Sequence, residues 1–231
     1  MRFGATGDGD AADYDFSSLD SLLAPSSVAI VGASGDTQRI GGRPIDAMLK
    51  AGFKGRILPV NPNRVTVQGL ACYPSVDALP EVPDTAIIAV PPAHALKAVE
   101  DLGGKGCRSV TLFTAGFAEL GTEGSTMQEQ LLKTVRRHGM RMLGPNSLGV
   151  FNATINYYGT FSSSLELAFP LKGNIGIASQ SGAYGGHLAA VARQRNIGAP
   201  VLVATGNEAD ISVGDVIGWM AESDSIDVIC A

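Results

Sequence analysis

The sequence is poor in cysteine and contains no long apolar run. Only 3 cysteines occur in 231 residues, and Cys72, Cys107 and Cys230 lie far apart. This number and spacing exclude a disulfide framework and a zinc ribbon, and predict reduced thiols in a cytoplasmic protein. No apolar run reaches the roughly 18 residues that a membrane-spanning helix needs. We therefore expect a cytoplasmic protein with no membrane partner.

An excess of positive charge is also lacking. Lysine and arginine total 17 against 22 aspartates and glutamates, for a net charge of −5. This balance argues against a nucleic-acid partner. It leaves room for a small anionic ligand, because backbone N–H groups at the start of a helix hold phosphate without net positive charge.

Glycine is abundant, with 29 residues spread through a chain that is 45% hydrophobic. Short apolar runs alternate with helical patterns and glycine turns, which is typical of βα units with a parallel sheet. The length suits two domains. We predict a disordered leader at 1–18, one α/β domain at 19–148, a connector or hairpin at 149–172, and a second α/β domain at 173–231. That second domain ends on a strand, so we expect the natural protein to continue or another chain to complete it.

The predicted elements follow from these runs. In the first domain the strands are expected at 27–31, 56–60, 85–90, 109–113 and 141–143, and the helices at 94–102 and 127–138. In the second domain the strands are expected at 174–178, 200–204 and 227–230, and the helices at 182–195 and 211–221.

A glycine-rich turn, Gly32-Ala33-Ser34-Gly35, follows the first predicted strand. We expect it to open a helix directly, so that free N–H groups and the positive end of the helix dipole face a pyrophosphate. Taken alone, such a turn is compatible with NAD, FAD, CoA or a purely structural βα connection.

The end of the second strand narrows these choices. An NAD site needs a carboxylate there for the ribose hydroxyls, but the chain has Asn61-Pro62-Asn63-Arg64. This disfavours NAD and suits a ligand with an additional ribose phosphate, as in NADP and CoA. Arg39, Arg43 and Arg64 are candidate partners for that phosphate, and each is equally compatible with a solvated surface arginine.

The remaining strand ends carry loop-type residues. Val90-Pro91-Pro92 forms either a rigid turn or a flat lip for an adenine, Thr114-Ala115-Gly116 follows the fourth strand, and Asn146 follows the fifth. Open α/β sheets bind ligands at the carboxyl ends of their strands. We therefore predict a ligand site along this edge.

A second loop, Ser179-Gln180-Ser181-Gly182-Ala183, follows the first strand of the second domain. Two serine hydroxyls and the N–H groups of a helix start suit a single phosphate. The alternative is an ordinary helix cap, which needs only one serine.

Seven segments resemble, in order, the α-type part of NDP-forming acyl-CoA synthetases, which include ADP-forming acetyl-CoA synthetase and succinyl-CoA synthetase. They are LLAPSSVAIVGAS, ILPVNPN, AIIAVPP, FTAGFAELG, RMLGPNSLGV, GNIGIASQSGA and TGNEAD. The resemblance implies a Rossmann-like parallel-sheet CoA-binding domain followed by a flavodoxin-like α/β domain. It implies acid–CoA ligation through an acyl phosphate and a phosphohistidine.

The resemblance also assigns the candidate residues. CoA contacts are implied at Gly32, Ala33, Ser34, Gly35, Asn61, Pro62, Asn63, Val90, Pro91, Pro92, Thr114, Ala115, Gly116 and Asn146. Phosphate contacts are implied at Ser179, Ser181, Gly182 and Ala183. No metal ligand is implied.

Two departures limit what the resemblance implies. His94, His138 and His187 lack the sequence context of the phosphorylated histidine, so we predict no catalytic residue in this chain. Gly186 stands where succinyl-CoA synthetases carry a tyrosine near the substrate, which leaves the small carboxylic acid open. ATP or ADP with Mg would bind to a nucleotide-grasp domain or β-type subunit outside this chain, in an oligomer.

Two other functions remain open from the sequence. The first is a CoA-sensing regulatory module of a protein acetyltransferase, and the second is an NADP-binding oxidoreductase.

Overall fold

The computed structural model describes residues 16–231. The predicted leader therefore lies outside the described residues, except for its last three positions. Those positions begin the 3-10 helix η1 (Phe16–Leu19), which is followed by the short helix α1 (Asp20–Leu23).

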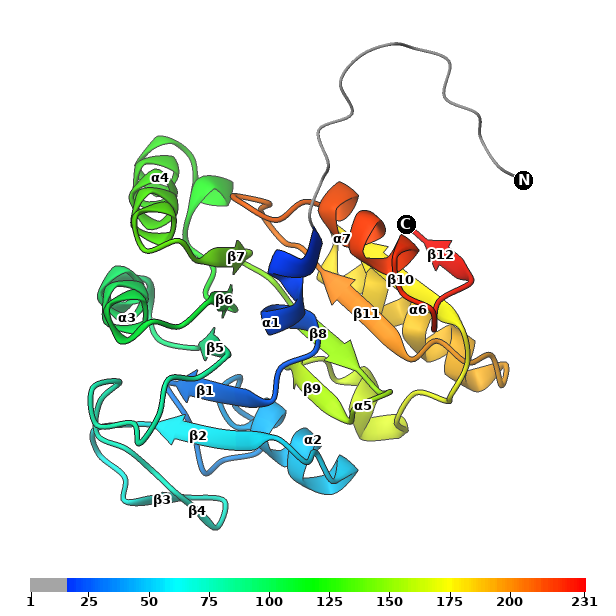
Figure 1. The fold of residues 1–231 in the computed structure, drawn as a ribbon, viewed down its shortest axis with the longest axis horizontal. Coiled ribbons are helices and arrows are strands. Elements are labelled where there is room, and N and C mark those ends of the chain that lie inside the picture. The colour runs from blue at the N-terminus through cyan, green and yellow to red at the C-terminus, as the bar shows by residue number, and fades with distance from the viewer. Residues whose placement is uncertain (1–15) are drawn as a thin grey trace.

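The first sheet contains five parallel strands in the order β2-β1-β5-β6-β7 (Figure 1). The strands are β1 (Ser27–Val31), β2 (Arg56–Val60), β5 (Thr85–Ile88), β6 (Ser109–Leu112) and β7 (Arg141–Leu143). The predicted parallel sheet is confirmed, with strand ends within two residues. The chain leaves β1 toward one side of the sheet and leaves β5 toward the other. The point between these two strands is where an open α/β sheet forms a ligand crevice.

Helices cover both faces of the first sheet. Ala29 points toward α3 (Pro92–Lys105) and α4 (Thr122–Arg137), while Val28 points toward α1 and α2 (Arg43–Ala51). Our expectation that α3 ends before Gly103 and Gly104 is wrong, because it runs on to Lys105. Glycine occurs at position 103 within this helix because the end of α4 packs against it and leaves no room for a side chain. A Cβ at this position would lie 2.4 Å from the ring of His138.

The second sheet is mixed, in the order β12-β10-β11-β8-β9. The parallel strands are β10 (Ile175–Ser179), β11 (Val201–Ala204) and β12 (Val228–Cys230). Helix α6 (Gly182–Gln194) packs on the face that carries Ser179, and α7 (Val213–Ala221) packs on the opposite face, over Gly176.

The segment expected as a connector or hairpin forms a hairpin. Strand β8 (Gly149–Asn152) pairs antiparallel with both β11 and β9 (Tyr157–Thr160), and the short helix α5 (Ser164–Leu167) follows. The hairpin therefore belongs to the second sheet. Three further elements have no counterpart among those predicted: β3 (Thr66–Val67), β4 (Leu70–Ala71) and the 3-10 helix η2 (Ala118–Leu120).

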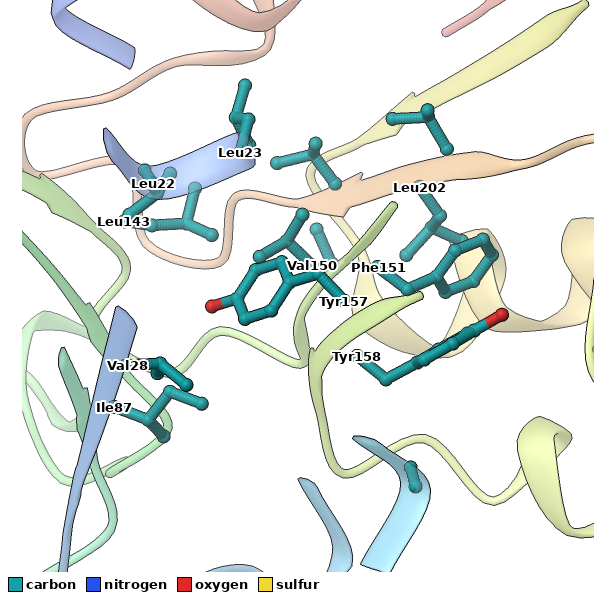
Figure 2. Close-up of a cluster of buried hydrophobic side chains, with 14 of the residues drawn as sticks. Leu22, Leu23, Val28, Ile87, Leu143, Val150, Phe151, Tyr157, Tyr158 and Leu202 are labelled. Carbon is teal, nitrogen blue, oxygen red and sulfur yellow. The ribbon is translucent and has the colours of Figure 1, made fainter. Parts of the chain in front are cut away.

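One apolar core joins the two sheets (Figure 2). Leu22 and Leu23 of α1 belong to the same buried cluster as Val28 of the first sheet and Val150 of the second. The hairpin β8–β9 and α1 therefore fix the first sheet against the second (Figure 1). Within residues 16–231, no helix has both the length and the apolar content to cross a bilayer.

Tyr157 lies in this core with its hydroxyl unpaired. Its side chain is fully buried, and the oxygen has no hydrogen-bond partner among residues 16–231. Burial raises the pKa of this phenol, so the group stays neutral. An unpaired buried hydroxyl costs about 1–3 kcal/mol.

We expect Tyr157→Phe to raise the free energy of unfolding by about 1 kcal/mol, because it removes only the unpaired oxygen. Urea unfolding followed by circular dichroism measures this. Tyr158→Phe is the matched control, because the Tyr158 oxygen is not among the buried unpaired atoms. A Tyr157→Phe protein less stable than the wild type would contradict the expectation.

Candidate functional site

The glycine-rich turn does not open a helix directly, contrary to our prediction. Helix α2 begins only at Arg43. The N–H groups of Gly32 and Ala33 donate to the carbonyl of Val60, and that of Ser34 donates to the carbonyl of Gly41. Val60 at the end of β2 and Gly41 within the loop therefore accept from the amides that were expected to be free. An eleven-residue loop, 32–42, separates β1 from α2.

This loop nevertheless borders a hollow of about 820 Å³ at the end of β1. Gly35, Ile40 and Gly41 line it, and their N–H groups have no partner among the described residues. Arg39 and Arg64 also line it. The Asp36 carboxylate lines it as well and offsets the charge of Arg39. Unpaired amides and the Arg64 guanidinium are the groups that suit phosphate.

Some of the predicted CoA contacts line this hollow and others do not. Its lining includes Gly32, Ala33, Ser34, Gly35 and Asn61. The side-chain amide of Asn61 donates to the carbonyl of Ala33 at 2.8 Å, and its oxygen accepts from the N–H of Asn63. Pro62 and Asn63 lie in the exposed turn beyond and are not part of the lining.

Arg43 does not line this hollow. Its guanidinium donates to the carbonyl of Phe161 and forms an ion pair with Glu166 at 2.9 Å. These contacts fix Arg43 between α2 and α5. Of the three arginines considered as phosphate partners, Arg39 and Arg64 line the hollow, and Arg39 forms an ion pair with Asp36 at 3.5 Å.

The other strand ends form a continuous row of loops. The hydroxyl of Thr114 donates to the carbonyl of Val90 at 2.7 Å, and the N–H of Asn146 donates to the carbonyl of Thr114 at 2.9 Å. Gly116 packs on Pro92, where an added Cβ would lie 2.9 Å from the ring. The row thus runs from β5 through β6 to β7. Ala115 is exposed on it, and Pro91 caps the start of α3.

Glu119, which is not one of the predicted contacts, fixes the position of the loop at Gly116. One carboxylate oxygen accepts from the N–H groups of Gly116 and Phe117, and the other accepts from the side-chain amide of Asn207 in the second domain. Burial acts to raise the pKa of Glu119, but the hydrogen bonds from Asn207, Gly116 and Phe117 outweigh it and lower that pKa. Both residues occur in the quoted motifs, which the sequence places at this edge of the sheet, but neither is among the predicted contacts.

The second loop borders a hollow of about 330 Å³ together with Asn146. Ser181 caps α6 by accepting from the N–H of Tyr184 at 3.3 Å. The N–H groups of Gly182 and Ala183 line the hollow and have no partner among the described residues. This is the arrangement of a helix start that can hold one phosphate.

Ser179 is placed differently from the other three predicted phosphate residues. It is buried, and its hydroxyl donates to the carbonyl of Ser181 at 3.0 Å. Its role in the structure is to shape the loop.

A third hollow of about 700 Å³, the channel, connects the two loops. It shares Gln38 and Ile40 with the first hollow, and Leu148 and Gly182 with the second. The two regions of free amides are therefore joined along one side of the molecule.

The comparisons with known proteins agree with this arrangement. Residues 26–153 match the family described as CoA binding domain, and residues 172–231 match the succinyl-CoA ligase like flavodoxin domain. The chain belongs to the CoA-binding domain family. The resemblance to NDP-forming acyl-CoA synthetases is confirmed by its relatives.

Three of these similar proteins illustrate the match. A trans-feruloyl-CoA synthase from an unknown prokaryotic organism is 37% identical over 91% of this chain and 30% of its own length. An ADP-forming acetate–CoA ligase α subunit of Pyrococcus furiosus is 34% identical over 89% of this chain and 44% of its own length. The solved acetyl-coenzyme A synthetase of Ca. Korarchaeum cryptofilum, in complex with phosphate and ADP, has a TM-score of 0.84 at 36% identity. It is covered to 44%, and this chain to 91%. The chain thus spans less than half the length of these relatives.

The histidines lie apart from the two loops of free amides. His94 is exposed at the start of α3, and His138 lies 3.1 Å from Glu100 at the end of α4. His187 lies further along α6 and borders the channel. Within residues 16–231, no group of three or more histidine, cysteine, aspartate or glutamate side chains could hold a metal ion.

Proposed function

We propose that this chain is the CoA-binding part of an ADP-forming acid–CoA ligase. One observation carries the proposal. A continuous row of strand ends leads from the phosphate-suited hollow at Gly35 to the free amides at Gly182. Such a row suits an extended ligand whose charged end and reacting end lie far apart.

Different groups of residues would contact different parts of the CoA molecule. The phosphates and the ribose would lie against the amides of Gly35, Ile40 and Gly41, with Arg39 and Arg64 as cationic partners and Asn61 holding the loop. The chain leading to the thiol would follow Val90–Pro92 and Thr114–Gly116. Asn146 borders both this row and the second hollow, so the thiol would lie beside it.

The second loop would hold the phosphate that the reaction transfers. In the ligation step the CoA sulfur bonds to the carbonyl carbon of an acyl phosphate and the carbon–oxygen bond to phosphate breaks. The proton of the thiol leaves with the phosphate. The amides of Gly182 and Ala183 and the Ser181 hydroxyl would stabilise the departing phosphate. Ser179 would act by shaping the loop.

The remaining parts of the reaction belong to the proposal as well. The phosphohistidine would belong to the ligase-type domain, beyond strand β12. The site for ATP or ADP with Mg would lie in a nucleotide-grasp domain or β-type subunit. The proposed units are a CoA-binding domain at 19–148 and a ligase-type domain at 173–231, whose sheet is extended by the hairpin of the connecting segment 149–172, in an oligomeric cytoplasmic enzyme. Neither the acetyltransferase module nor the NADP oxidoreductase gains support, because the relatives are ligases.

Isothermal titration of the chain with CoA, 3′-dephospho-CoA and NADP tests this proposal. We expect CoA to bind, and dephospho-CoA to bind roughly tenfold more weakly because it loses charge-assisted bonds to arginine. NADP should bind no more tightly than dephospho-CoA. Binding of NADP without binding of CoA would overturn the proposal.

A further inference from the structure

A fourth hollow, the α5 cavity, lies beneath α5 and apart from the proposed CoA route. Its volume is about 340 Å³, and most of its wall is apolar. The apolar residues that line it are Phe151, Leu165, Ala168, Pro170, Ala189 and Ala190. An apolar cavity of roughly 150 Å³ already accepts benzene. The α5 cavity is therefore large enough for an aromatic ring with its linking carbons.

The α5 cavity adjoins the channel that ends at the second loop. Both hollows include Ser164 and Ala190 in their walls. Helix α6 runs past both, with Ala183 at its first turn and Ala190 seven residues further on. At about 1.5 Å per residue, these two positions lie roughly 10 Å apart along the helix. A carboxyl group at Ala183 and an apolar tail at Ala190 can thus belong to one molecule.

Gly186 keeps the passage between these two positions open. A Cβ there would lie 3.3 Å from the Ser162 hydroxyl, on the opposite wall of the channel. A side chain larger than that of glycine at position 186 would fill the channel between α6 and Ser162. The missing side chain at Gly186 therefore leaves space for a ligand between the first turn of α6 and Ala190.

We propose that the α5 cavity binds the apolar tail of the acid substrate, so that this ligase acts on an arylalkyl carboxylic acid. The inference rests on the proposed function, and it adds the substrate class. The wall also contains Ser164, Arg193, Gln194 and Asn196. Arg193 donates from Nε to the carbonyl of Phe169.

Isothermal titration with CoA, acetyl-CoA and 3-phenylpropionyl-CoA tests the proposal on the chain itself. We expect phenylpropionyl-CoA to bind about tenfold more tightly than acetyl-CoA, because only its ring reaches the α5 cavity. Ala190→Leu should abolish this advantage, since the larger side chain fills the junction. Its affinities for CoA and acetyl-CoA should stay within twofold of the wild type, which also reports that the variant is folded.

Ala221→Leu is the matched control, because Ala221 is exposed on α7 and borders none of these hollows. It should keep the full advantage of phenylpropionyl-CoA. Equal affinities for the two thioesters in the wild type would overturn the cavity proposal and leave CoA binding intact. Tighter binding of phenylpropionyl-CoA than of acetyl-CoA in Ala190→Leu would also overturn the cavity proposal. Absence of CoA binding would instead overturn the proposed function, and this inference with it.

Discussion

Gly32→Ala is expected to lower the free energy of unfolding by about 3 kcal/mol. Gly32 has φ +91°, a conformation that costs other residues roughly 1–2 kcal/mol. A Cβ at this position would lie 2.5 Å from the carbonyl oxygen of Ala89 and 2.9 Å from its carbon. Neither backbone atom can move aside without separating β1 from β5, and such overpacking costs about 1–3 kcal/mol.

Gly35→Ala is the matched control in the same loop. Gly35 borders the same hollow, but it has no positive φ, and an added Cβ would meet nothing within 4 Å. We expect its stability to stay within about 0.5 kcal/mol of the wild type. Urea unfolding of both variants gives the comparison. Equal losses in the two proteins would show that the loop, rather than the contact with Ala89, limits stability.

This contact changes the reason why Gly32 matters. From the sequence, a side chain at Gly32 is expected to block the approach of a phosphate. In the structure the added atom would instead point into the crevice between β1 and the loop after β5. CoA affinity would fall in Gly32→Ala because the two loops that border the site are forced apart.

The sheets could be predicted from the sequence, since the buried strands are continuous apolar runs between turn residues. Ser27–Val31 and Arg56–Val60 are recovered without error because both ends carry local signals. The hairpin β8–β9 could not be assigned to a sheet. Its partner β11 lies about fifty residues further along the chain, and four-residue strands carry too little periodicity to specify that pairing.

The candidate site, too, could be predicted only in part from the sequence. The parallel sheet places the strand ends together, so the positions of Gly35 and Asn146 at this edge follow from the pattern of elements. The roles of Arg43 and Ser179 do not, because Glu166 and the Ser181 carbonyl take up their side chains. Residue type predicts which groups can bind a phosphate, but only the fold decides which of them are already occupied.

Glu119→Gln is expected to weaken CoA binding about tenfold, although Glu119 lies outside the predicted contacts. The oxygen of the new side chain can still accept from the N–H groups of Gly116 and Phe117. Its amide, however, would meet the amide of Asn207, and two donors would then face each other. The loop at Gly116 would lose its direct bond to the second domain and keep only the link through Gln128, whose oxygen accepts from the Ala118 N–H and the Asn207 amide. A charge-assisted bond contributes roughly 1.5–3 kcal/mol, and solvent reduces this at the exposed Glu119 to the low end.

Adding Asn207→Asp to Glu119→Gln should restore most of the CoA affinity. The new carboxylate at position 207 accepts from the side-chain amide introduced at position 119, so the bond returns with donor and acceptor exchanged. Asn207→Asp alone should weaken binding, because it places two carboxylates against each other. Titration calorimetry of the four proteins measures the coupling between the two positions. Additive effects would contradict a direct bond between the two side chains.

The pH dependence distinguishes this role from a general loss of structure. Since the hydrogen bonds lower the pKa of Glu119, their contribution is complete above the unfolded value of about 4.3. It is lost as the pH falls through the lowered folded pKa. Glu119→Gln has no proton to gain, so its CoA affinity should lack this acid decline while the wild type shows it. The double variant carries an ionisable group at position 207 instead, so the decline should return with the restored bond.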